Sequence, residues 1–351
     1  MKRRSRTLLL GALPMVALSS LLLMPEIPGT DVQFTVPYAI ESPGPTFNTL
    51  GSVDGKEVVR VSGVPTDQTH GNLNMTTVAV TSGITLPQAI AEGLWSENSL
   101  VPIEQIFPQN ISREEQQEVN DADFAASEAS ATTAALHYLD RPMEVQVAQV
   151  LDEGPAQNKL EAGDVVLKVD GKKVDSPEAV KSIIEEFAPG DEVDVTVKRG
   201  ERETTQKVTL GERPHAKTPT AFLGITMQET SAEGIEVTYN LEDIGGPSAG
   251  LIFALAVVDK LDDRDISGGK FVAGTGTIDG EGNVGPIGGI THKIRASEEA
   301  GAEIFLAPAG NCAEVNAMHP EHIVVAKVST LEEAVEALEG FQRGQTVATC
   351  E

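Results

Sequence analysis

Cysteines, cations and nucleotide-binding loops are the features that this sequence has least of. It contains two cysteines, and no histidine or further cysteine at ligand spacing lies near either, which argues against a metal site. Its 26 lysines and arginines are outnumbered by 53 acidic residues, and a charge of −27 argues against nucleic acid and against broad adhesion to anionic lipid. Because no G-x-x-x-x-G-K-[ST] sequence occurs, we expect no ATP as a partner and no ATP-driven unfolding.

The N-terminus departs from this acidity. Residues 1–7 form a basic tip, and residues 8–24, "LLLGALPMVALSSLLLM", carry no charge. This run is near the lower length limit for a membrane-spanning helix, and no A-x-A cleavage site follows it. The pattern favours an uncleaved transmembrane anchor over a cleaved signal. The basic tip would stay in the cytoplasm. We therefore expect a single-pass cell-membrane protein with the bulk of the chain, from about Pro25, outside the cytoplasm.

The 351 residues predict two or three domains, because one hydrophobic core rarely organises so long a chain. Residues 32–111 contain short strands such as "EVVRVSG" and "MTTVAVTSG", bounded by glycine, and predict a β-rich juxtamembrane segment. Residues 112–139 predict a linking helix, since Ser112 and Glu115 form a capping box before an alanine-rich stretch.

Residues 142–211 predict a small α+β domain. "MEVQVAQV" alternates, Asp170 and Gly171 mark a turn, and "SPEAVKSIIEEF" predicts an amphipathic helix capped by Ser176. The arrangement, notably "AGDVVLKVDGKKV", resembles a PDZ domain. That family binds extended peptide ends by strand addition beside such a helix. Where the family has a glycine-containing carboxylate loop before its first strand, this chain reads "YLDRPMEV". This departure argues against capture of a free C-terminus.

The last region, residues 221–346, follows a polar linker at 213–220 and alternates strands with helices, which predicts an α/β or α+β domain. Its strands include "EIFLAP" and "HIVVAKV", and its last helix is "TLEEAVEALEGF". Outside the cytoplasm, the isolated pair Cys312 and Cys350 predicts a disulfide that ties the C-terminal tail to this domain.

Ser248, in "GGPSAGLIFALAVV", is either a helix-capping residue or a nucleophile. A serine at the start of a buried helix has unpaired backbone N–H groups and the positive end of the helix dipole nearby, and both can stabilise an oxyanion. Gly246 and Ala249 flank this serine and are expected to support the site. A nucleophilic serine also needs a base.

Two kinds of base are open. A histidine would follow the hydrolase pattern, but the residues before the turn, "VTYNLEDI", are too polar for the buried strand of that fold. Of the histidines after the serine, His292, His319 and His322 have no distinctive context. Lys293 is the alternative, because "THKIRASEEAG" predicts a helix capped by Thr291 with this lysine in its first turn. Burial and the dipole there would lower the pKa of the amine and favour its neutral form.

The stretches "GGPSAG" and "GPIGGITHK" together resemble the Ser-Lys protease domain of the Lon family. The resemblance covers about residues 222–341 and implies Ser248 as nucleophile, Lys293 as its base, and Thr275, in "GTGTI", as a hydrogen-bonding partner of the lysine. Relatives of the domain assemble in rings, which implies a homo-oligomer. The whole layout resembles the membrane-anchored bacterial PDZ–Lon proteases.

These observations predict a multidomain chain: transmembrane helix, β-rich segment, PDZ-like α+β domain and Lon-type α/β (α+β) domain. Its predicted function is that of an ATP-independent serine endopeptidase without cofactor or metal, acting on exported or membrane-proximal polypeptides that the PDZ-like domain docks or gates. The alternative is a non-catalytic PDZ scaffold for exported proteins. Gly245 favours that alternative, because better-known Lon members have an aspartate there. A serine–histidine hydrolase is a third, more distant hypothesis.

Overall fold

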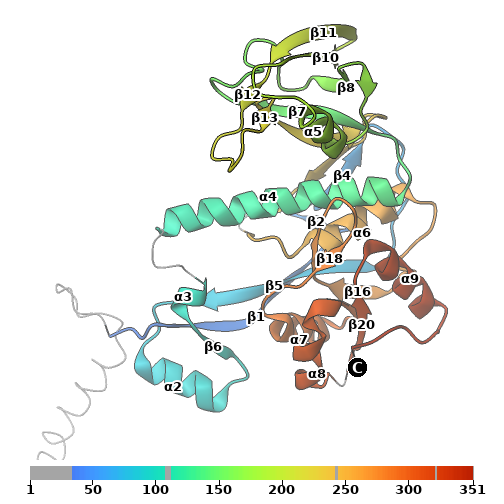
Figure 1. Ribbon diagram of the computed structural model, residues 1–351. Coiled ribbons are helices and arrows are strands. Elements are labelled where there is room, and N and C mark those ends of the chain that lie inside the picture. Colours follow the sequence, from blue (N-terminus) through green and yellow to red (C-terminus); the bar gives the residue numbers. More distant parts are fainter. Residues whose placement is uncertain (1–33, 107–111, 242–243, 321, 351) are drawn as a thin grey trace, which may run out of the picture.

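The computed structural model describes residues 34–106, 112–241, 244–320 and 322–350, which form two units (Figure 1). The main unit contains residues from both ends of the described chain. The inserted unit contains residues 143–231 and lies above the main unit in Figure 1.

A six-stranded mixed sheet organises the main unit. In spatial order its strands are β20 (Val324–Val328), β19 (Ile304–Pro308), β16 (Phe271–Gly274), β5 (Asn72–Thr81), β1 (Tyr38–Asn48) and β6 (Ser99–Pro102). The first four run parallel, whereas β1 pairs antiparallel with both β5 and β6. The strands from the region predicted as a β-rich juxtamembrane segment therefore share one sheet with the C-terminal region. The physical reason is that Leu73 and Met75 on β5 are almost fully buried and need this partner layer.

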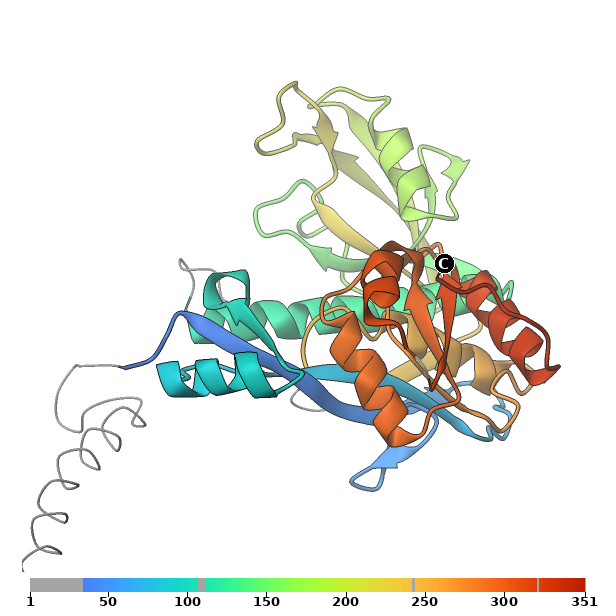
Figure 2. The ribbon, with the colours of Figure 1, turned by 90° about the horizontal axis from the view of Figure 1, so that it is seen from below.

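Helices cover the main sheet and extend beyond one end of it, where α2 lies at the end of β1 farthest from α9 (Figure 2). They are α2 (Leu86–Trp95), α3 (Ile103–Ile106), α4 (Arg113–Tyr138), α6 (Gly250–Leu261), α7 (Ile290–Ala300), α8 (Cys312–Met318) and α9 (Leu331–Gln342). Three two-stranded ladders complete the unit: β15 (Glu236–Tyr239) with β4 (Val59–Ser62), β17 (Thr277–Ile278) with β18 (Val284–Gly285), and β2 (Ser52–Val53) with β3 (Lys56–Glu57). A 3₁₀ turn at Ala309–Asn311 precedes α8.

Helix α6 is the centre of the main unit. All twelve of its residues are buried, as its apolar sequence predicts for a helix packed on every side. Helix α4 packs along it, with Phe124 meeting Phe253 edge to face at 5.6 Å between ring centroids. The predicted capping box of α4 is confirmed, because Ser112 and Glu115 bond each other's backbone N–H groups.

The inserted unit is a second sheet with one helix. In spatial order its strands are β11 (Arg202–Thr209), β10 (Glu192–Arg199), β8 (Val165–Val169), β7 (Met143–Val150) and β14 (Ile225–Ser231), and β9 (Lys172–Lys173) pairs with β8. The unit also contains a two-stranded ladder of β12 (Gly211–Glu212) and β13 (Ala221–Phe222). Its helix is α5 (Pro177–Ile184). Ser176 caps α5, as predicted. Residues 221–231 belong to this unit and not to the C-terminal domain, because β14 pairs with β7 and Leu223 is buried in the same core.

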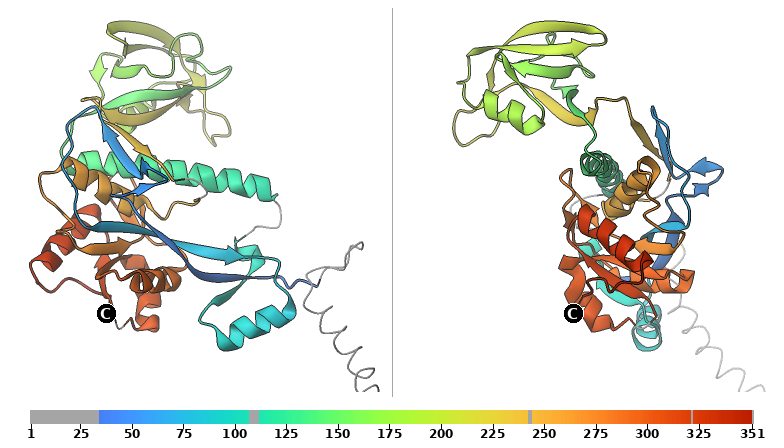
Figure 3. Two further views of the ribbon diagram at one scale, coloured as in Figure 1. Left: turned by 180° about the vertical axis from the view of Figure 1, so that it is seen from behind. Right: turned by 90° about the vertical axis from the view of Figure 1, so that its right-hand side faces the viewer.

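The inserted unit interrupts the main unit in the chain. It enters directly after α4 and leaves into β15, which pairs with β4 from the N-terminal part of the main unit. The two crossings, where the chain passes from one unit to the other, lie close together. Met143 at the start of β7 pairs with Ser231 at the end of β14. Figures 1 and 3 show α4 lying between the two units.

The expected membrane topology needs correction. Within the described residues no helix is both long and apolar enough to cross a bilayer. The longest, α4, has 26 residues, but it is rich in Glu, Gln, Asn and Asp. Residues 1–7 and 8–24, where the basic tip and the anchor were predicted, lie outside the described residues. We therefore remove the transmembrane helix from the fold class and withdraw the single-pass membrane location.

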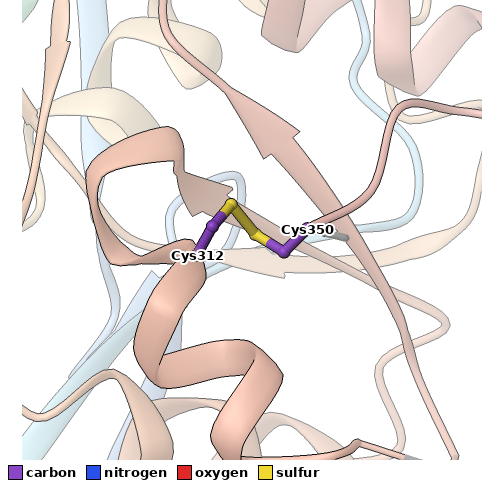
Figure 4. Close-up of a disulfide and its surroundings, with 2 residues drawn as sticks. All are labelled: Cys312 and Cys350. Atoms are coloured by element: carbon purple, nitrogen blue, oxygen red, sulfur yellow. A yellow bond between two sulfur atoms is a disulfide. The ribbon is translucent and has the colours of Figure 1, made fainter.

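A disulfide joins Cys312 at the start of α8 to Cys350 near the C-terminus, the pairing that the sequence predicted (Figure 4). The tail before Cys350 lies beside β20, where the N–H of Lys327 donates to the carbonyl of Ala348. The bond therefore fixes both the tail and the N-terminal end of α8.

Candidate active site

The loop before α6 holds Ser248 half-buried at the surface of the main unit. The helix cap is Ala249, so Ser248 is not the capping residue. Gly246 has a φ of 86°, in the left-handed region that favours glycine. Gly250 has no room for a side chain, because a Cβ there would lie 2.9 Å from Ile278 and 2.9 Å from Ser127. The glycines of "GGPSAG" thus fix the turn and its close packing.

Helix α4 supports this loop from the other side. The hydroxyl of Ser127, which is 5% exposed, donates to the carbonyl of Pro247 at 3.1 Å. The N–H of Gly246 donates to the carbonyl of Asn120 at 3.0 Å. Sequence reasoning treated this helix as a linker and missed its contact with the serine loop.

Lys293 lies in the first turn of α7, as predicted, and is 3% exposed. Its Nζ is 2.9 Å from Ser248 Oγ and 3.0 Å from Thr275 Oγ1. Burial lowers the pKa of Lys293 from 10.5 to about 8, because a charged ammonium is poorly solvated there. The structure thus brings together the three side chains that the sequence singled out.

The start of α7 differs from the prediction. Its N-cap is Gly289, with a φ of 68°, and Thr291 lies inside the helix. A Cβ on Gly289 would meet Val78 of β5 at 2.7 Å, so glycine lets α7 begin against the sheet. Gly301 ends the helix in the left-handed conformation.

Thr275 connects the amine of Lys293 with the loop of Ser248. Its hydroxyl, 1% exposed, accepts from Lys293 Nζ and donates to the carbonyl of Ser248 at 3.0 Å. The carbonyl of Ser248 also accepts from the N–H of Gly276 at 2.9 Å. Within the described ranges, the N–H groups of Ser248 and Ala249 have no hydrogen-bond acceptor. They are free for an oxyanion, whereas the N–H of Gly246 is occupied by Asn120.

The histidines lie elsewhere. His292 Nε2 is 2.9 Å from the hydroxyl of Ser99 on β6, so its ring points away from Ser248. His319 ends α8, and His322 lies in the loop before β20. Lys293 is thus the basic side chain that hydrogen-bonds Ser248 among the residues that the structure describes. No cluster of three or more His, Cys, Asp or Glu side chains in that part of the chain could hold a metal ion.

Two hollows meet at Ser248. The first, about 500 Å³, has the apolar side chains of Phe47, Met75, Phe124 and Ile244 in its wall, together with Lys293. The second, about 480 Å³, lies on the side of Pro247 and Pro286. The serine therefore stands where an extended polypeptide could place residues on both sides of one bond.

A separate hollow of about 180 Å³ lies in the inserted unit, between α5 and β14. Val180 and Ile184 line one side, and Ile225 and Met227 line the other. The loop before β14 contains Gly224, with a φ of 79°. The sequence pattern predicted this loop at "YLDRPMEV", directly before β7. The strand that lines the hollow opposite α5 is β14, so the corresponding segment of this chain is "AFLGITM".

Comparison with known proteins finds two family models in the chain, of which the PDZ match includes most of α4 and stops before β14. Residues 115–210 match the PDZ domain model, and residues 242–339 match the Lon protease (S16) C-terminal proteolytic domain model. The chain carries a PDZ domain and a Lon-type proteolytic domain. The Lon-type match begins after the inserted unit, and the main unit also contains β1 to β6 from before it.

Relatives cover different shares of the chain. An archaeal Lon protease of Methanothermobacter thermautotrophicus is 30% identical over 213 residues, covering 56% of this chain and 31% of that protein. A probable periplasmic DegP-like serine endoprotease of Halomonas elongata is 38% identical over 80 residues, covering 22% of this chain and 17% of that protein. The chain thus spans less than a third of the length of these relatives. The solved PDZ domain of an SdrC-like protein from Listeria monocytogenes is 30% identical and covers 24% of this chain and 86% of that one, with a TM-score of 0.22.

Proposed function

We propose that this protein is a serine endopeptidase in which Lys293 activates Ser248. The observation that carries the proposal is the 2.9 Å contact between Lys293 Nζ and Ser248 Oγ at a lysine that is 3% exposed. A buried amine with a lowered pKa is neutral often enough near neutral pH to accept a proton. Thr275 holds the amine in place from its other side.

The reaction follows from these positions. Lys293 takes the proton of the Ser248 hydroxyl as Oγ attacks the peptide carbonyl carbon, and the N–H groups of Ser248 and Ala249 stabilise the oxyanion. The ammonium then gives its proton to the leaving amine, and an ester of Ser248 remains. Water, deprotonated by Lys293, hydrolyses this ester, releases the carboxylic acid and regenerates the hydroxyl.

We propose that this reaction needs no ATP, because the sequence has no Walker A motif. Substrates would then be unfolded or flexible polypeptides. The PDZ domain would dock them by strand addition at β14, where α5 and the loop at Gly224 form a groove.

The test is cleavage of casein by the purified protein without nucleotide. We expect Ser248→Ala and Lys293→Ala each to lower the rate by at least about a thousandfold, because the pair acts as a unit. Lys173→Ala, an exposed lysine on β9, is the matched control and should cleave like the wild type. Equal activity of all four proteins would rule out the Ser-Lys endopeptidase. Binding of polypeptide without cleavage by the wild type would favour the scaffold.

A further inference from the structure

The second hollow beside Ser248 differs from the first in its charge. Pro247, Pro286 and Ile287 supply apolar wall, and Glu314 of α8 supplies a carboxylate. Glu314 is the one charged residue in the described lining of this hollow, and no described cation lies within ion-pair distance of it. It accepts one hydrogen bond, from Asn311 Nδ2 at 3.3 Å. The exposed carboxylate of Glu314 therefore borders a space that opens next to Ser248, and no described cation pairs with it.

The turn of α8 that carries Glu314 is held by its neighbours. The side chain of Asn311, 2% exposed, accepts from the N–H of Ile287 at 3.0 Å and donates to its carbonyl at 2.8 Å. These bonds tie the start of α8 to the opposite wall of the hollow. The disulfide between Cys312 and Cys350 holds the same end of the helix (Figure 4). Glu314, two residues further on, is thus presented on a rigid support.

We propose that Glu314 is a specificity-determining residue that favours a lysine or arginine of the substrate in the second hollow. The inference rests on the proposed endopeptidase function. Ser248 lines both hollows, so the residues on the two sides of the cleaved bond enter different environments. The apolar stem of a lysine or arginine packs against Pro286 and Ile287, while its charged end reaches the carboxylate. A glutamate or aspartate of the substrate in the second hollow would be repelled by the carboxylate of Glu314.

The experiment uses a set of quenched fluorescent peptides that share one sequence and carry Lys, Gln or Glu at each position flanking the cleaved bond. For the wild type we expect kcat/KM for the Lys peptide to exceed that for the Gln peptide by about fivefold at one of these positions, as one partly exposed ion pair allows. The Glu peptide should be the slowest. The preference should shrink at 1 M salt, where the Debye length is about 3 Å.

Variants assign the preference to one residue. Glu314→Gln should remove it, and Glu314→Lys should make the Glu peptide the fastest. Glu299 is an exposed acidic residue on α7 that lines neither hollow. Glu299→Lys changes the net charge by the same amount as Glu314→Lys and should keep the wild-type order of peptide rates. The cleavage sites in a casein digest, identified by mass spectrometry, should show lysine and arginine enriched on the same side of the bond. In the Glu314→Gln digest this enrichment should vanish.

The outcomes separate the two proposals. Equal rates for the Lys, Gln and Glu peptides, or a Lys preference that survives Glu314→Gln, would overturn the role of Glu314 and leave the endopeptidase intact. Cleavage that is unchanged in Ser248→Ala would remove the proposed function and this inference with it.

Discussion

Lys293 is the residue whose environment the proposal depends on most. Its amine is buried among groups that do not neutralise an ammonium: two hydroxyls hydrogen-bond it, and the cause of its lowered pKa is burial. A protein that needs a neutral lysine keeps it in such a place at a cost in stability, because the unfolded chain solvates the charged form better.

This cost makes stability depend on pH in a defined window. Between about pH 8 and 10.5 the unfolded state binds more protons at Lys293 than the folded state, so the folded wild type gains stability as pH rises. We expect Lys293→Met to be more stable than the wild type at pH 8. The difference in unfolding free energy should shrink by about 3 kcal/mol across this window. Denaturant unfolding of both proteins at several pH values measures it. Lys173→Met, at an exposed lysine on β9, is the matched control. A pH-independent Lys293→Met difference would mean that the amine of Lys293 is well solvated.

At the scale of elements, α4 is more than a connection. It packs along α6, and it bonds the loop before Ser248 at two points, through Ser127 and Asn120. At its other end His137 lies 3.1 Å from Glu229 on β14 and 2.9 Å from the carbonyl of Gly280. One helix therefore contacts the serine loop and the strand that lines the PDZ groove.

The contact with the serine loop predicts the effect of Ser127→Ala. The change removes the hydrogen bond to Pro247 and should lower the unfolding free energy by about 1 kcal/mol. Because the loop loses a positioning bond, kcat should fall about tenfold while KM changes little. Steady-state kinetics with a short peptide test this. Ser130→Ala, at a half-buried serine on the same helix whose hydroxyl makes no hydrogen bond to the described residues, is the control. An equal effect of both variants would contradict the role of α4.

At the scale of the whole molecule, the unit of residues 143–231 is an insertion in the main unit. Met143 and Ser231 are paired neighbours, which places the two crossings about 5 Å apart. Replacing residues 143–231 by a short glycine–serine linker should therefore leave the main unit folded. Cleavage of a short peptide should stay within roughly threefold, since the main loss is the partly exposed His137–Glu229 pair. Casein cleavage should fall more. An unfolded variant, by circular dichroism, would contradict this arrangement.

The proximity of the candidate residues was easier to predict from the sequence than the connectivity of the fold. Ser248, Lys293 and Thr275 could be assigned because two glycine-rich stretches each carry a local pattern, and the structure brings these residues together. The amphipathic pattern of α5 and the capping box of α4 are also contained in short stretches of sequence, so both helices could be predicted. The partners of β5 and β14 were not, because an alternating strand looks the same whichever sheet it joins. The support of the serine loop by Asn120 involves a backbone carbonyl and leaves no trace in the residue types.

The most direct measurement is the rate at which a serine-directed electrophile, such as a fluorophosphonate, labels Ser248 as pH is varied. A buried lysine base with a pKa of about 8 predicts a rate that rises roughly tenfold per pH unit below that value and then levels off. In Lys293→Ala the rate should be low and lack this step. A step near pH 6.5, typical of histidine, or a wild-type profile retained in Lys293→Ala would contradict the Ser-Lys pair.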